Sequence, residues 1–351
     1  MLNVLTEQLR RRENLTEEQV REAITHLTAE PVAVEAKADF LTALAQKGEA
    51  TEEIAAFARH LRELSVQPPL DAETRAREIL DVCGTGGDKL NTFNISTTVA
   101  LVCASGGVTV AKHGNRAITS QSGSADVLET LGIRIDLTPE EAVRSLKEHH
   151  FAFFFAQKYH PAFKHIGPAR KLCAERGQRT IFNFLGPLMN PVRPSAQLIG
   201  VPRPQLCEPM AHVLQSLGIR RGMVVTGRVP VPGKPTPAYL DEFSTLGETT
   251  VAEYYQDRGF STSSLSPENY PLQAATLADL AGGDKEANAI IVRRVLAGDE
   301  RGPKRDAVLL NAGAALFVAG KVKSITEGWE LAANLIDDGR AAAQLKALSG
   351  R

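Results

Sequence analysis

The chain has 351 residues, of which 43% are hydrophobic and 23% are charged, a composition typical of a globular protein. Its 40 basic and 41 acidic residues leave a formal net charge of −1, which offers no general attraction for nucleic acid or for a membrane surface. No apolar run is long enough to cross a bilayer, and the four cysteines form no CxxC pair, so we expect a cytoplasmic protein with reduced thiols. The length exceeds that of one ordinary hydrophobic core, which predicts two domains.

Helical patterns occupy the first 69 residues. Thr16 begins a capping-box pattern, which predicts the start of a helix. Periodic apolar positions predict further helices over residues 34–46 and 51–64, and Pro68 marks the end of the helical run. We therefore expect a small all-helical domain over residues 1–69.

Beyond residue 80, short apolar runs alternate with helical patterns. The candidate strands cover residues 80–83, 108–111, 152–156, 196–201 and 223–226. The candidate helices lie near residues 97–104, 124–132, 138–149, 204–217, 284–297, 306–319 and 325–337. This alternation is typical of βαβ units and predicts an α/β domain with a mainly parallel central sheet flanked by helices.

A helical segment at residues 160–179 interrupts this alternation. We interpret the chain over about residues 159–182 as returning to the helical domain. The α/β domain then comprises residues 70–158 and 183–351.

A glycine-rich turn, Gly84-Thr-Gly-Gly-Asp88, follows the first candidate strand. Glycines allow the backbone to come close to a ligand, and such a turn can aim several N–H groups at one anion. Asn94-Ile-Ser-Thr97 then opens an apolar helix, whose unpaired N-terminal N–H groups favour phosphate. The spacing matches neither a P-loop nor a dinucleotide-binding fingerprint. Taken alone, the turn is equally consistent with a phosphate site and with an ordinary strand-to-helix connection.

A second polar stretch, Lys112-His-Gly-Asn-Arg116, follows the second candidate strand. Its lysine and arginine offer positive charge for phosphate, and its histidine and asparagine offer further hydrogen-bonding groups. Ser120, Ser122 and Ser124 lead into another helix N-terminus. A basic surface loop is the alternative, but ligands in open parallel sheets bind beyond the carboxyl ends of the strands, where both polar stretches lie.

The order of these motifs resembles the anthranilate phosphoribosyltransferase family. The matching stretches extend over almost the whole chain and comprise Gly84–Asp88, Asn94–Thr97, Lys112–Arg116, Gly123–Glu129, Thr180–Pro191, Asp241-Glu242 and Leu309–Leu316. The resemblance implies transfer of the 5-phosphoribosyl group of phosphoribosyl pyrophosphate (PRPP) to the amine of anthranilate, with Mg²⁺ as cofactor, in tryptophan biosynthesis. It also implies a helical domain beside an α/β domain similar to that of pyrimidine nucleoside phosphorylases, and a homodimer formed through the helical domain.

The resemblance further implies the site residues. PRPP would be bound by Gly84, Gly86, Gly87, Asp88, Thr92, Asn94, Ser96, Thr97, Lys112 and Ser124. Anthranilate would face Gly84, His113, Asn115 and Arg170. Mg²⁺ would be held by Ser96, Asp241 and Glu242. We assign no general base, because an aromatic amine is already neutral at neutral pH.

The side-chain chemistry of these residues is compatible with the implied roles, and each residue also has a structural interpretation. Carboxylates suit Mg²⁺, but Asp241-Glu242 is also consistent with an ordinary solvated acidic pair. A guanidinium can pair bidentately with the carboxylate of anthranilate, although Arg170 is also explained by packing over apolar neighbours. His113 is equally well explained as a structural histidine.

The sequence departs from the family pattern at three places. Lys89 stands where the family usually has glycine, which puts the local backbone in question or adds a cation near pyrophosphate. The segment between Arg170 and Thr180 is longer than usual, so Arg176 or Arg179 is an alternative partner for the acceptor. The loop before Asp241 is also longer.

Two other functions are alternatives to phosphoribosyl transfer. A nucleoside phosphorylase of the same architecture would use orthophosphate and would not need a paired acidic metal site. A nucleic-acid-binding relative without catalysis would need a basic groove, against which the balanced charge argues.

Overall fold

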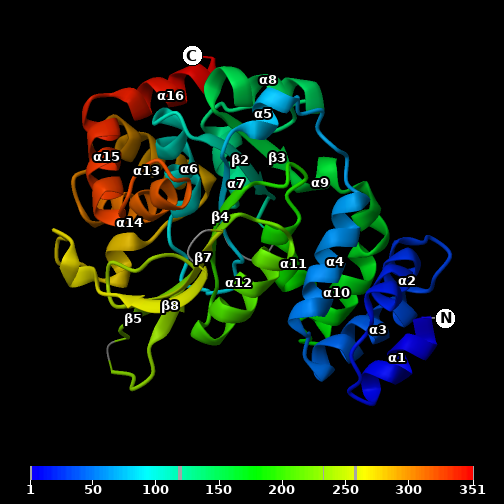
Figure 1. Ribbon diagram of the computed structural model, residues 1–351. Coiled ribbons are helices and arrows are strands. Elements are labelled where there is room, and N and C mark those ends of the chain that lie inside the picture. The colour runs from blue at the N-terminus through cyan, green and yellow to red at the C-terminus, as the bar shows by residue number, and fades with distance from the viewer. Residues whose placement is uncertain (1, 118–120, 232, 257–258, 351) are drawn as a thin grey trace.

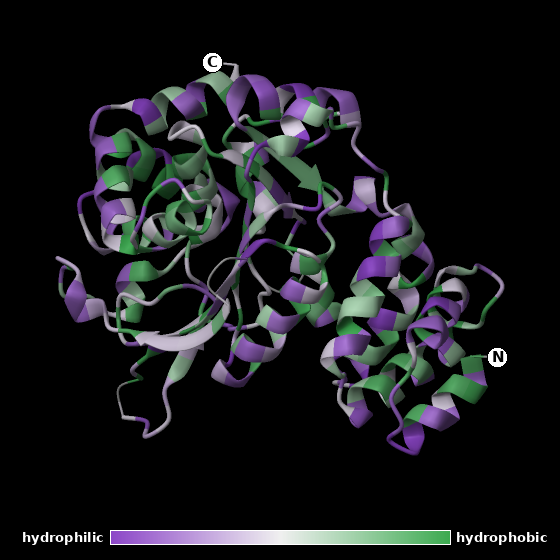
Figure 2. Ribbon diagram, viewed as in Figure 1, coloured by the Kyte–Doolittle hydropathy of each residue, from purple (hydrophilic) through white to green (hydrophobic). Residues whose placement is uncertain are grey.

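The computed structural model describes residues 2–117, 121–231, 233–256 and 259–350 (Figure 1). The chain opens with four helices, α1 (Leu2–Arg10), α2 (Glu17–Thr28), α3 (Val34–Lys47) and α4 (Thr51–Glu63). The predicted capping box is present, because the backbone N–H of Gln19 donates to Thr16 Oγ1 and the Gln19 side chain accepts from the Thr16 N–H. These helices form the bundle at the right of Figure 1, and they alternate hydrophilic and hydrophobic residues, as amphipathic helices do (Figure 2).

A later segment of the chain lies against this bundle. It contains the 3₁₀ helix η1 (Pro161–His165) and helix α10 (Gly167–Glu175), and α10 packs on α3. The buried Lys37 of α3 donates a hydrogen bond of 2.9 Å to the carbonyl of His165. The bundle therefore contains segments that precede the first three strands in the sequence and segments that follow them.

The larger part is built on an eight-stranded sheet, in which seven strands have the order β3-β2-β1-β4-β5-β7-β8 and the eighth, β6, pairs with β5. The five strands β1 (Ile79–Gly84), β2 (Thr109–Gly114), β3 (Phe151–Phe155), β4 (Ala196–Gly200) and β5 (Arg221–Val229) are parallel. The strands β6 (Ala238–Leu240), β7 (Thr249–Tyr255) and β8 (Gly259–Leu265) are antiparallel. The predicted fold class and all five predicted strands are confirmed. The antiparallel strands were not predicted, and the exposed, serine-rich β8 shows why, since it lacks apolar alternation.

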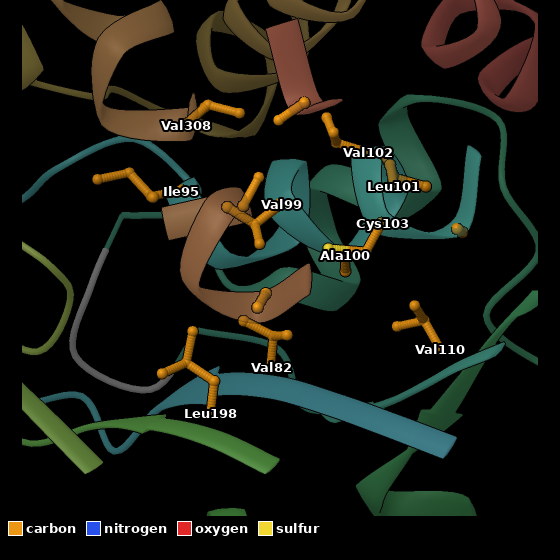
Figure 3. Packing of buried hydrophobic residues seen from close by; sticks show 14 of the residues in the cluster. Val82, Ile95, Val99, Ala100, Leu101, Val102, Cys103, Val110, Leu198 and Val308 are labelled. Atoms are coloured by element: carbon orange, nitrogen blue, oxygen red, sulfur yellow. The ribbon is translucent and has the colours of Figure 1, made fainter. Parts of the chain in front are cut away.

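Helices cover both faces of the sheet. The remaining helices are α5 (Ala72–Ala76), α6 (Ile95–Ser105), α7 (Ser124–Thr130), α8 (Pro139–His149), α9 (Ala156–Tyr159), α11 (Phe182–Leu188), α12 (Cys207–Ser216), α13 (Lys285–Ala297), α14 (Pro303–Val318), α15 (Ile325–Asp337) and α16 (Arg340–Ser349). Helix α6 is apolar almost all round because it lies between the sheet and the C-terminal helices, where Val99 faces Val82 and Leu198 (Figure 3). On the opposite face, Cys83 and Ile199 join α12 and the helical bundle in one continuous core.

No helix in the described part of the chain is long and apolar enough to span a bilayer. All four cysteines are buried free thiols.

The connectivity of the sheet reverses beside β1. The chain runs from β1 outward to β2 and β3, and then returns to the other side of β1 to form β4 and β5. In open parallel sheets, ligands bind outside the carboxyl ends of the strands at such a reversal. We therefore expect a ligand site at the carboxyl ends of β1 and β4.

Candidate functional site

Asp241 of the acidic pair packs closely on two glycines at the ends of β1 and β4. Gly84 and Gly200 are partners in the register of the two strands. A Cβ atom on Gly84 would lie 2.1 Å from Oδ2 of Asp241, and one on Gly200 would lie 1.5 Å from the Asp241 carbonyl oxygen. Asp241 directly follows β6, so the antiparallel hairpin carries it across the ends of both parallel strands. Only glycine leaves room for this crossing.

This close approach gives a stability prediction. We expect Gly200→Ala to displace the main chain at Asp241 and to lower the free energy of unfolding by about 1–3 kcal/mol, the usual cost of overpacking. Gly167→Ala is the matched control, since a Cβ at Gly167 meets no atom within 4 Å. Urea unfolding of the two variants measures the difference. Equal stability of both variants would show that Asp241 does not lie tightly on the strand end.

The acidic pair already occupies two anion-binding backbone groups. The N–H of Gly86 donates to Asp241 Oδ2 at 2.6 Å. The N–H of Ser96, in the first turn of α6, donates to the carboxylate of Glu242. The amides predicted to bind an anion therefore lie at this site, where they donate to the protein's own carboxylates.

Several carboxyl groups lie close together in the site. Burial and, after it, the neighbouring Asp88 carboxylate raise the pKa of Asp241 to about 8. Burial and then Asp241 raise the pKa of Glu242 well above its ordinary value. Lys112 is 1% exposed and donates to the Val82 carbonyl at 2.6 Å and to Ser96 Oγ at 3.3 Å, and its charge opposes the rise in the pKa of Glu242. One lysine does not compensate the acidic side chains around it.

A divalent cation fits this arrangement. Mg²⁺ usually binds one or two carboxylates, keeps several waters and bridges to substrate phosphates. Asp241, Glu242 and the hydroxyl of Ser96 provide oxygen ligands of this kind. Among the described residues, no group of three or more His, Cys, Asp or Glu side chains forms a complete metal cage.

The raised pKa of Asp241 predicts how metal-free stability depends on pH. The folded protein retains a proton that the unfolded chain, with a carboxyl pKa near 3.8, has already released, so stability falls as pH rises toward the folded pKa of about 8. The buried histidines act in the opposite direction only below their ordinary pKa of 6.5. We therefore expect the melting temperature to fall from pH 6.5 to pH 8.

Mg²⁺ should reduce this fall, because it binds deprotonated carboxylates. Calorimetry over the same pH range with and without Mg²⁺ measures the effect. A metal-free melting temperature that stays constant or rises over this range would contradict the raised pKa of Asp241.

The glycine loop uses left-handed backbone at four of its residues. Gly86 and Gly87 have φ values of +74° and +86°, and Lys89 and Asn91 have φ values of +62° and +53°. Lys89 thus keeps the backbone that a glycine would adopt there, at some steric cost, and its side chain is exposed. Thr92 forms a bridge with Ala281, which fixes the end of the loop.

The side chains of Asn94 and Ser124 form hydrogen bonds that connect neighbouring elements around the site. The Asn94 side chain accepts from Asn288 Nδ2 at 2.9 Å and donates to the Ser122 carbonyl at 3.3 Å, so it joins α13 to the second polar stretch. Ser124 Oγ donates to the Asn115 carbonyl at 3.4 Å. A Cβ on Gly114 would lie 2.2 Å from Ser124 Oγ, so the end of β2 packs directly on the start of α7.

One expectation from the second polar stretch needs correction, and one residue of α6 is more deeply buried than expected. Thr97, the third residue of α6, is 1% exposed, as Lys112 is, and its role toward PRPP stays a prediction. Arg116 is not a free cation for phosphate, because it pairs with Asp126 at 3.0 Å and Glu129 at 2.8 Å. Ser120 lies outside the described residues.

The acceptor residues come from both parts of the fold. His113 is in β2 and Asn115 directly follows this strand, whereas Arg170 is on α10. The Arg170 guanidinium lies 5.0 Å from the centre of the Phe182 ring, is half-buried, and has no carboxylate partner among the described residues. Arg176 pairs with Asp39 at 3.3 Å, and Arg179 is exposed, so neither offers a comparable half-buried cation.

Sequence reasoning missed a buried polar network below the site. Asp81 in β1 is fully buried, which raises its pKa to about 6. It accepts hydrogen bonds from Asn190 at 3.0 Å and from the N–H of His113 at 3.3 Å. A carboxylate in the middle of an apolar strand was the available signal, because a buried charge requires partners.

Comparisons with known proteins agree with this geometry. Family profiles described as "Glycosyl transferase family, helical bundle domain" and "Glycosyl transferase family, a/b domain" match residues 4–65 and 76–342. The chain is 46% identical over 348 residues to an anthranilate phosphoribosyltransferase of Lacticaseibacillus casei, covering 99% of this chain and 96% of that protein.

Solved structures are similar over the same length. The crystal structure of an anthranilate phosphoribosyltransferase from Thermus thermophilus has a TM-score of 0.86 and 41% identity, covering 99% of this chain and 98% of that one. The Saccharomyces cerevisiae enzyme in complex with PRPP and Mg has a TM-score of 0.85 and 27% identity, covering 99% and 97%.

Proposed function

The chain belongs to the anthranilate phosphoribosyltransferase family, and we propose that it transfers the phosphoribosyl group at the carboxyl ends of β1, β2 and β4. The reaction joins the 5-phosphoribosyl group of PRPP to the amine of anthranilate and releases pyrophosphate, a step of tryptophan biosynthesis. One observation supports this location, namely that Asp241 lies on the glycine ends of β1 and β4 while the adjacent Glu242 meets the backbone of Ser96 at the start of α6.

We assign the pyrophosphate end of PRPP to the glycine loop and the start of α6. The groups that would hold PRPP are Gly84, Gly86, Gly87, Asp88, Thr92, Asn94, Ser96, Thr97, Lys112 and Ser124. Phosphate oxygens would compete with Asp241 and Glu242 for the amides of Gly86 and Ser96. Neutralising those carboxylates is therefore a condition for tight binding.

We assign Mg²⁺ to Ser96, Asp241 and Glu242. When bound, the metal would supply positive charge that offsets the charge of pyrophosphate as it leaves. Displacement at the ribose C1 atom is expected to pass through an oxocarbenium-like state, as in glycoside chemistry. The task of the protein is then to position both substrates and to stabilise the departing charge.

We assign anthranilate to the region between β2 and α10. Arg170 would pair with the carboxylate of anthranilate, and Asn115 would donate or accept at its polar edge. Both ring nitrogens of His113 are already hydrogen bonded, to the Gly186 carbonyl and to His160, so His113 would contribute through its ring edge, beside Gly84. A general base is not needed, because the neutral aromatic amine attacks directly and can release its proton afterwards.

An assay with anthranilate, PRPP and Mg²⁺ tests the function. Loss of anthranilate fluorescence is the expected signal. Phosphorolysis of thymidine or uridine with orthophosphate and no Mg²⁺ would instead indicate a nucleoside phosphorylase. Salt-dependent retention on single-stranded DNA without turnover would indicate a nucleic-acid-binding relative.

We also propose a homodimer formed through the helical domain. Among the described residues, the exposed large apolar side chains are Val4, Leu64, Val66 and Ile290, and all but Ile290 lie in the first 69 residues. Light scattering during gel filtration tests this proposal. The cytoplasmic location stays a prediction.

A further inference from the structure

Two buried histidines meet where the α/β domain contacts the segment before α10. His113 ends β2, and His160 lies between α9 and η1. Their Nε2 atoms are 3.1 Å apart, and the rings meet edge to face at 76°. The two residues are 7% and 3% exposed. Burial lowers the pKa of His113 to about 3 and that of His160 to about 4, so both rings are neutral at neutral pH.

The hydrogen-bond partners determine where the protons are. Nδ1 of His113 lies 3.1 Å from the Gly186 carbonyl, which only accepts, so this nitrogen carries the proton. Nε2 of a neutral His113 is then a bare acceptor, and a hydrogen bond across the contact of 3.1 Å needs a proton on Nε2 of His160. The buried Nδ1 of His160 has no hydrogen-bond partner of normal geometry among the described residues, which favours the proton on Nε2. His160 therefore fixes the tautomer and the orientation of His113.

His160 also connects His113 to the helix that carries Arg170. The His160 ring stacks on Phe163 with centres 5.2 Å apart, and Phe163 meets Phe182 edge to face at 5.6 Å. Phe182 in turn lies 5.0 Å below the Arg170 guanidinium. A continuous row of rings thus runs from the end of β2 to α10. It joins two elements whose residues must act on one small acceptor.

We propose that His160 is a positioning residue for anthranilate. It donates one hydrogen bond to His113 and anchors the ring row, and in this way it sets the distance between Asn115 after β2 and Arg170 on α10. This role rests on the proposed function, because it assumes that Asn115 and Arg170 share the acceptor. His160 itself touches no reacting atom, and the PRPP residues around the glycine loop do not depend on it.

Two variants separate the hydrogen bond from the stacking. His160→Phe keeps a ring against Phe163 but removes the donor. His160→Gln restores an N–H donor without the ring. His212→Gln is the matched control, because His212 also stacks on a phenylalanine, Phe260, with centres 4.4 Å apart, but on the exposed α12 face far from His113 in the fold.

The first measurement is ¹⁵N NMR of histidine-labelled protein. We expect His113 to be protonated at Nδ1 in the wild type and in His160→Gln, and to move toward the Nε2-protonated form in His160→Phe. The second is steady-state kinetics, where loss of one hydrogen bond should raise the KM for anthranilate about three- to tenfold in His160→Phe, with the KM for PRPP unchanged. His160→Gln should recover most of this loss.

The outcomes distinguish this inference from the proposed function. A wild type that does not consume anthranilate would overturn the function, and the NMR spectra would still decide the tautomer. An active wild type whose His113 carries the proton on Nε2 would overturn the inference alone. So would a His160→Phe variant with unchanged KM for anthranilate, or one in which the KM values for both substrates rise together.

Discussion

Replacing Asp241 by asparagine and Glu242 by glutamine is expected to lower Mg²⁺-dependent kcat/KM by about 100- to 1,000-fold, the range typical for removing a preorganised electrostatic group. The amide side chains keep the size of the carboxylates but cannot supply negative charge to a metal ion. The departing pyrophosphate would then lack the positive charge that offsets its own. Initial rates over a Mg²⁺ series measure the change.

The same double variant should not destabilise the metal-free protein. Burial raises the pKa values of both carboxylates, and repulsion adds to it, from Asp88 on Asp241 and from Asp241 on Glu242. At pH 8 the removal of the two carboxylates therefore relieves a cost of folding. We expect an equal or higher melting temperature there. Asp299→Asn with Glu300→Gln is the matched control, since it changes another adjacent acidic pair between α13 and α14. Retained Mg²⁺ dependence in the Asp241 and Glu242 variant would remove this pair from the metal site.

Replacing Arg170 by glutamine is expected to raise the KM for anthranilate by about 10- to 100-fold, as charge-assisted hydrogen bonds to a carboxylate contribute roughly 1.5–3 kcal/mol. Arg170 is a half-buried cation that has no carboxylate partner in the described chain, and burial lowers its pKa. A carboxylate from a ligand would compensate this charge. The KM for PRPP should stay close to that of the wild type.

Arg170→Lys tests the geometry of the contact. Lysine keeps the charge but lacks the planar pair of donors, so it should restore only part of the affinity. Arg176→Gln is the matched control, because Arg176 is near the end of the same helix and pairs with Asp39. If Arg176→Gln raises the KM for anthranilate and Arg170→Gln does not, the acceptor is bound by the other arginine.

The sequence alone determined the features that depend on neighbouring residues in the chain. The capping box at Thr16 closes within one turn of helix, and its pattern is therefore visible in the letters. The five parallel strands were recognised because buried strands are short apolar runs between helices. The glycine loop and the stretch after β2 were placed at strand ends for the same reason, and their order along the chain indicated the family.

Only the tertiary structure determined which distant residues are in contact. The antiparallel hairpin brings Asp241 onto Gly84 and Gly200, and the crowding there explains why both positions are glycine. The fold buries Thr97, and it pairs Arg116 with the carboxylates of Asp126 and Glu129, so that Arg116 is not the free cation that was expected. It also pairs His113 with His160, which are 47 residues apart. These contacts join distant parts of the chain, and their energies depend on packing and solvent exclusion, which a local pattern of residues does not record.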